Sequence, residues 1–127
     1  MSRVSVEVPA ELVEPVRETV LLLYRATAES LHQSLRAGDR EEAHSHRMRV
    51  DELDALAGVL AGGDVRLTGS RDLLHDILYG ALIDAGERLA ELSSEAWRGQ
   101  VPPERIQEAA GEVLSLNGLL RSLSPCR

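Results

Sequence analysis

Two segments of the chain alternate apolar and polar residues, and each is followed by long stretches with helical spacing. Residues 3–8 alternate with a period of two, and residues 65–68 repeat this pattern. Both segments predict short β-strands, whose successive side chains point to opposite faces. After each strand, apolar residues recur every three or four positions, which predicts amphipathic helices. The four predicted helices cover about 10–37, 39–61, 70–96 and 103–123.

Turn and cap residues separate these predicted helices. Gly38 suits the left-handed conformation that often ends a helix, and Asp39 can cap the helix that follows. Gly62 and Gly63 mark a break before the second strand. Ser70 is a suitable N-cap for the third helix. The order of elements is therefore strand, helix, helix, and then the same three again.

The two halves, 3–61 and 64–123, align with each other as tandem repeats. At a shift of 61 positions, Val4, Val6, Leu12, Val13, Val16, Leu21 and Leu22 fall on Val65, Leu67, Leu73, Leu74, Ile77, Leu82 and Ile83. At a shift of 63, Val50, Leu53, Leu56 and Leu60 fall on Val113, Leu116, Leu119 and Leu123. Two interpretations stay open, because any two amphipathic helices can be slid into agreement: a duplication, or a shared periodicity alone.

The predicted fold class is all-α, with one domain over residues 1–127. Short loops make neighbouring helices antiparallel, so we expect an antiparallel four-helix bundle. Both strands precede helices that begin at the same end of that bundle. Because two isolated short strands are unstable, we expect Val4–Val8 to pair with Val65–Thr68, either within one chain or across a dimer. The result is a small two-stranded β element at one end.

Composition and charge exclude several classes of function. The formal net charge is −7 and all 14 basic residues are scattered arginines, so we expect no nucleic-acid binding. The longest apolar run, Val20 to Tyr24, is far too short to span a membrane, and Cys126 is the only cysteine. No phosphate-binding loop or cofactor motif is present. We therefore expect a cytoplasmic protein without a cofactor.

A weak metal-site candidate lies in the first half. Glu29 and His32 have the Glu-x-x-His spacing that places both side chains on one helix face, as in di-metal helical bundles. A hairpin turning at 37–39 would bring His32 near His46. A complete site needs a second such motif and more carboxylates, so we expect no metal. A metal- or histidine-dependent enzyme at this end remains one alternative function.

Residues 3–12 resemble the opening of ribbon-helix-helix DNA-binding proteins. In that family an alternating strand pairs across a dimer and enters the major groove, so the resemblance implies a DNA-binding regulator that uses its N-terminal arm. This chain departs from the pattern in two ways. Its first helix runs for more than twenty residues, and Ser5 and Glu7 stand on the outward face after Arg3. A carboxylate that faces phosphates opposes binding.

The function that we expect is a non-enzymatic interaction or regulatory module that associates with itself or with another protein. No catalytic set of residues stands out, and the first helix has a wider apolar arc than one packed face needs. Val13, Val20 and Leu22 lie on this extra arc and are the candidate interaction residues. We expect them to be covered by a second copy in a homodimer.

Overall fold

Four helices and one two-stranded sheet make up the computed structural model, which describes residues 3–63, 65–99 and 101–123. The chain is mostly helical, as expected. Within the described residues, no helix is long and apolar enough to cross a membrane. The elements in chain order are β1 (Arg3–Glu7), η1 (Ala10–Leu12), α1 (Val13–Ala37), α2 (Arg40–Ala61), β2 (Arg66–Ser70), α3 (Arg71–Ala96) and α4 (Pro103–Leu123).

The two strands pair with each other in antiparallel orientation within one chain, which confirms the expected pairing. Val6 lies opposite Leu67 at the centre of the ladder, and the amide of Val8 donates to the carbonyl of Val65, 2.8 Å away. The inward residues Val6 and Leu67 are buried, whereas Ser5 and Thr68 face outward. β2 runs two residues further than expected and leads directly into α3.

The helix ends follow the local signals in the sequence. Gly38 has a left-handed φ of 76°, and the side chain of Asp39 accepts a hydrogen bond from the amide of Glu42 at 3.0 Å. Ser70 caps α3 by accepting from the amide of Leu73. Each cap satisfies backbone groups that a helix end leaves without a partner.

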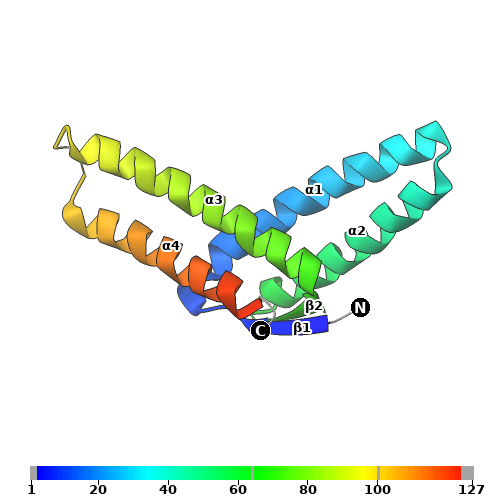
Figure 1. Ribbon diagram of the computed structural model, residues 1–127, viewed down its shortest axis with the longest axis horizontal. Helices are drawn as coiled ribbons and strands as arrows, with labels where there is room; N and C mark the ends of the chain where they lie inside the picture. Colours follow the sequence, from blue (N-terminus) through cyan, green and yellow to red (C-terminus); the bar gives the residue numbers. More distant parts are fainter. Residues whose placement is uncertain (1–2, 64, 100, 124–127) are drawn as a thin grey trace.

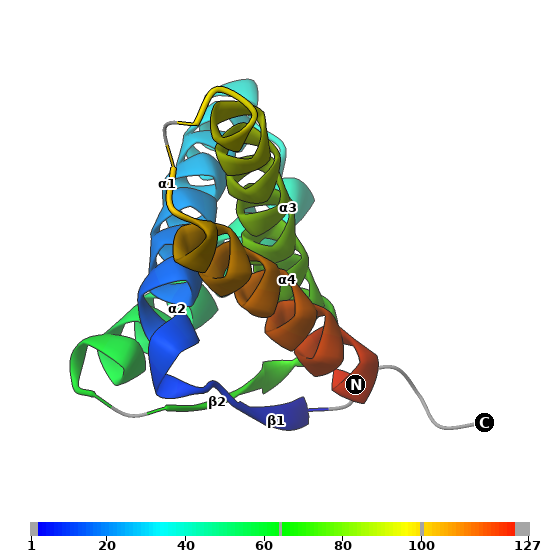
Figure 2. The ribbon, with the colours of Figure 1, turned by 90° about the vertical axis from the view of Figure 1, so that its left-hand side faces the viewer.

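The helices form two antiparallel hairpins that diverge as the arms of a V (Figure 1). One arm is α1 with α2, the other is α3 with α4, and the sheet lies at the base. Figure 2 shows α1 and α3 side by side above the two-stranded sheet of β1 and β2, which is called here the ribbon. Because the main helix contact between the hairpins is that of α1 with α3, the expected four-helix bundle is not confirmed.

The two arms cross where Thr19 of α1 meets Gly80 of α3. A Cβ atom on Gly80 would lie 2.9 Å from Cγ2 of Thr19, so only glycine permits this approach without a shift. The Thr19 hydroxyl donates to the carbonyl of Pro15 at 3.1 Å, which holds the side chain in place. Thr19 itself is 5 % exposed. Close helix crossing here depends on a missing side chain.

Equivalent residues of the two halves meet each other on a pseudo-twofold axis. Thr19 and Gly80 are 61 positions apart, and so are Val6 and Leu67 at the centre of the ribbon. Residues that contact their own equivalents lie near the axis that relates the two halves, and the antiparallel pairing at Val6 and Leu67 is the pairing expected at a twofold axis. The burial pattern agrees with this arrangement. Three further pairs at the same shift are each at most 1 % exposed: Leu12 with Leu73, Val16 with Ile77, and Val20 with Ala81.

One aliphatic core joins both halves at the base of the V. Burying one leucine or valine side chain of this core contributes about 1.5–3 kcal/mol.

The polar side chain of Glu52 connects α2 to the base of the V. Its carboxylate accepts from the amide and hydroxyl of Ser70 at 3.3 and 3.2 Å, and lies 3.3 Å from Nη1 of Arg3. Glu52 thus links α2 to both strands where α3 begins.

Candidate interaction surface

The three candidate interaction residues of α1 have different environments. Val20 is 0 % exposed and Val13 packs partly buried against the core. The interpretation of Val20 as an interaction residue is therefore wrong, because the crossing with α3 and the core already cover that side of α1. Leu22 is 56 % exposed and remains available to a partner.

Leu22 belongs to a group of exposed apolar side chains beside the helix crossing. The group, called here the apolar patch, consists of Leu21, Leu22, Tyr79 and Ile83, which are 45–56 % exposed. They make up four of the eight large hydrophobic residues that are exposed within the described part of the chain. Such a concentration of apolar side chains marks an interaction surface more often than single exposed residues do.

Helix geometry places the centre of the apolar patch on the open side of the V. Leu22 follows the crossing residue Thr19 by three positions and lies almost opposite Val20 on the helix. Ile83 has the same relation to Gly80 and Ala81 of α3. Because Val20 and Ala81 are buried, the side chains of Leu22 and Ile83 point away from the core. In Figure 1, α2 and α4 lie below α1 and α3, so among the described residues no other helix lies over this side.

Tyr79 gives the apolar patch a rigid aromatic member. Its ring stacks on that of His75, with ring centres 5.8 Å apart and an interplanar angle of 12°. The contact restrains a side chain that is otherwise half exposed. An aromatic residue that is already ordered loses little conformational entropy when a partner covers it, and aromatic residues are enriched at protein interfaces.

The weak metal candidates do not assemble in the structure. Glu29 and His32 are exposed on α1. His46 is half-buried on α2, where its Nε2 lies 3.6 Å from Oε1 of Glu42, one helical turn away. Among the described residues, no three histidine, cysteine, aspartate or glutamate side chains are grouped closely enough to hold a metal ion.

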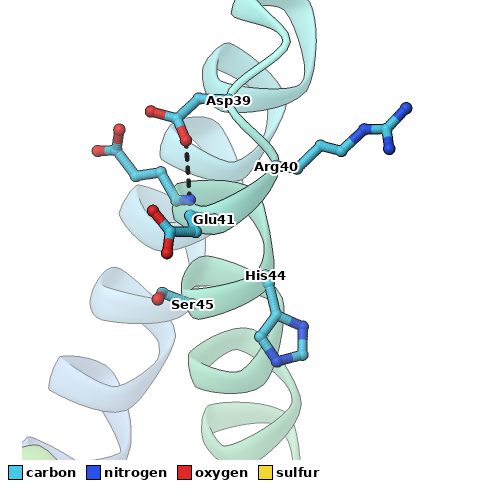
Figure 3. Close-up of a pocket in the computed structure, with 6 residues that line it drawn as sticks. Asp39, Arg40, Glu41, His44 and Ser45 are labelled. Atoms are coloured by element: carbon cyan, nitrogen blue, oxygen red, sulfur yellow. Dashed lines mark hydrogen bonds between the residues drawn. The ribbon is translucent and has the colours of Figure 1, made fainter.

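A hollow at the turn between α1 and α2 is lined by charged side chains that diverge (Figure 3). Arg40 and His44 extend to one side of the helix, whereas Glu41 and Ser45 lie on the other. The only hydrogen bond drawn there is the cap made by Asp39. Catalysis requires groups that converge on one point, and these do not.

The outward face of the ribbon is polar and balanced in charge. Ser5 and Thr68 share a hydrogen bond of 2.8 Å between their hydroxyl groups. Nη2 of Arg66 donates to Oε1 of Glu7 at 3.1 Å, and Arg3 pairs with Glu52 as described above. Each arginine of this face thus has a carboxylate beside it, which reduces the positive field available to a phosphate backbone.

The sequence pointed to only part of the apolar patch. Tyr79 and Ile83 lie off the apolar stripe of α3, so periodicity alone left them as ordinary surface residues. The shift of 61 positions, which places Leu22 on Ile83, was the available signal. That shift indicates a shared surface only when the structure shows that α1 and α3 cross at Thr19 and Gly80.

Comparison of the chain with protein-family models, with curated proteins and with solved structures found no match.

Proposed function

We propose that the protein is a non-enzymatic helical interaction module that associates with itself. The observation that supports this proposal is the apolar patch, the four half-exposed apolar side chains that α1 and α3 carry within about one turn of their crossing. Apolar area removed from water stabilises a complex by about 25 cal/mol per Å², before the costs of association. The proposed setting is the cytoplasm, in keeping with a sequence that contains a single cysteine.

Solution mass tests the proposal directly. Light scattering at tens of micromolar should return twice the chain mass of 13.9 kDa. Dilution should shift the mass towards that of one chain, because association depends on concentration. A constant mass of one chain over this range would contradict self-association.

A ribbon-type DNA regulator is a second candidate, favoured by the antiparallel β1–β2 pairing. That pairing places within one chain the ribbon that the resemblance implied across a dimer. The balanced charges of its outward face and the net charge of −7 oppose this function. We expect no measurable duplex binding at about 150 mM salt, at which weak phosphate contacts are largely lost. A salt-sensitive gel shift that disappears when Arg3 and Ser5 are replaced would favour the regulator instead.

An enzyme that depends on metal or histidine at Glu29, His32 and His46 is the remaining alternative. The exposed positions of Glu29 and His32 give such a site few ligands. Metal analysis of protein purified without a histidine tag should find less than stoichiometric zinc or iron. A full equivalent of either metal, lost when His46 is replaced by alanine, would support the enzyme.

A further inference from the structure

Carboxylates without a partner surround the apolar patch on both helices. On α1 they are Glu18, within one turn before the patch, and Glu29, about two turns after it. On α3 they are Asp84, Glu87 and Glu91, which follow the patch within about two turns. All five residues are exposed, and no ion pair or hydrogen bond involves their carboxylates within the described chain.

The cations beside the apolar patch are fewer, and most of them are paired. The pairs are Arg17 with Glu14, Arg88 with Glu112, and Arg49 with Asp76. His75 lies beside the same Asp76, with 4.0 Å between its Nδ1 and the carboxylate. Arg25, exposed on α1, is the one arginine next to the patch that has no carboxylate partner in the described ranges. The free charge around the patch is therefore mainly negative.

An apolar contact with an acidic rim favours a partner that carries cations around its own apolar stripe. Opposite charges across an interface speed the encounter of the partners, whereas juxtaposed like charges weaken association. A second copy brings the same carboxylates to the contact, so self-association at this surface should be weak at low salt and stronger when salt screens the charges. A basic partner meets no such repulsion.

The arrangement of the elements favours a helix as the binding segment of that partner. Both strands lie at the base of the V, so the described chain offers no strand edge beside the apolar patch (Figure 1). A helix can place apolar side chains at i, i+3, i+4 and i+7 against a surface made by two other helices. A single helix is about 10–12 Å across, so it can reach the crossing between arms that diverge from it.

We propose that the apolar patch binds a basic amphipathic helix of another protein. The apolar stripe of that helix covers Leu22, Tyr79 and Ile83, and its lysine or arginine side chains face the free carboxylates of α1 and α3. This inference goes beyond self-association. Because both would use the same surface, the partner helix competes with a second copy for the patch.

A model peptide tests the chemistry of the partner. The peptide has about 18 residues, with leucines every three or four positions and lysines elsewhere, so that it forms an amphipathic helix. Fluorescence anisotropy should show that the wild-type protein binds it, and that the affinity falls several-fold as salt rises from about 50 to about 300 mM. The same peptide with glutamate in place of lysine should show no measurable binding.

Charge variants test whether the carboxylates beside the patch are the ones that act. Glu18→Gln and Glu87→Gln should each weaken binding of the lysine peptide about two- to fivefold, the usual contribution of an exposed ion pair. Glu108→Gln is the matched control. It removes an exposed carboxylate from α4, outside the patch, so it should leave the affinity unchanged.

Apolar variants test the location of the contact. Leu22→Ser and Ile83→Ser should each weaken binding about tenfold, because less apolar area is removed from water. Leu114→Ser is the matched control, since Leu114 is 72 % exposed on α4, and it should bind as the wild type does. Circular dichroism should show the same helicity in all three variants, because every one of these side chains is exposed.

The outcomes separate this inference from the proposed self-association. Equal binding of the lysine and glutamate peptides, or an equal loss in Glu108→Gln and Glu87→Gln, would overturn the inference. A wild-type dimer that Leu22→Ser dissociates but an excess of lysine peptide leaves intact would assign the patch to a second copy, and would also overturn it. A wild type that has the mass of one chain and binds the lysine peptide would contradict self-association alone.

Discussion

Gly80 shows how a single residue sets the distance between the two arms. The nearest atom to an added Cβ would be Cγ2 of Thr19, a short β-branched side chain that is buried and hydrogen-bonded to Pro15. Such a side chain can move aside only by giving up that bond or by pushing the helices apart. Helix propensity favours alanine over glycine by about 1 kcal/mol, so the two effects oppose each other.

We predict that Gly80→Ala lowers the free energy of unfolding by about 1–2 kcal/mol, because the cost of overpacking exceeds the gain in helix propensity. Urea denaturation would measure the change. Gly86→Ala on the same helix is the control. A Cβ there has no atom within 4 Å, so this variant should be more stable by about 0.5–1 kcal/mol.

Replacing Thr19 by serine should reverse the loss of stability that Gly80→Ala causes. Thr19→Ser removes Cγ2 but keeps the hydroxyl that donates to Pro15, so Gly80→Ala should be tolerated in its presence. A double-mutant cycle would give a coupling free energy of about 1 kcal/mol or more between the two positions. Additive effects would show that the crossing does not depend on this contact.

At the scale of elements, Glu52 joins three parts of the fold that are distant in the sequence. Its carboxylate lies on α2, accepts two hydrogen bonds from Ser70 at the start of α3, and pairs with Arg3 of β1. The Glu52 side chain is 24 % exposed and that of Arg3 is 64 % exposed, so water screens the ion pair. The hydrogen bonds to Ser70 should therefore contribute most of the stabilisation.

We predict that Glu52→Ala lowers the free energy of unfolding by about 1–2 kcal/mol, since two hydrogen bonds to a charged acceptor are lost. Asp54→Ala, two residues further along α2 at an exposed position, should change it by less than about 0.5 kcal/mol. Thermal or urea unfolding compares the two variants. Equal stabilities would mean that Glu52 does not hold the strands to α2.

Local elements of this fold could be predicted from the sequence because their causes are local. The caps at Asp39 and Ser70 and the turn at Gly38 depend on single residue types, and strand pairing followed from the order of elements. The divergence of the hairpins had no such signal. Amphipathic stripes show which side of a helix is buried but not the angle at which two hairpins meet, and here that geometry depends on Gly80 lacking a side chain.

The candidate interaction surface could be anticipated only in part, for the same reason. Leu22 could be identified because it stands outside the main stripe of α1. Val20 was misplaced, since the width of an apolar arc does not reveal that a second helix covers part of it. Tyr79 joins the apolar patch through the crossing, a contact between helices far apart in the sequence.

At the scale of the whole molecule, neither half has a core of its own. Buried residues from both strands and all four helices form a single cluster at the base of the V. A half chain would lose its partner strand and would expose the buried sides of α1 or α3. Small domains bury too little surface to tolerate such a loss.

We predict that fragments 1–63 and 64–127 do not fold as separate monomers. Each alone should show weak helicity and no cooperative thermal transition by circular dichroism. An equimolar mixture of the two fragments should recover the helicity and the cooperative transition. The ribbon and the helix crossing can form between two chains as well as within one. A fragment that is monomeric and unfolds cooperatively would contradict the shared core.

The contact of α4 with β1 has a consequence for the order of the chain. It brings the last described helix to the first strand, so both described ends lie at the base of the V (Figure 1). A circular permutant that begins at Val65, joins the old termini through a short linker and ends at Gly63 should therefore reach the same structure. Its free energy of unfolding should fall by only about 1 kcal/mol, the cost of changing one loop closure. During synthesis of this permutant, the second half would leave the ribosome first, and folding would still require both halves.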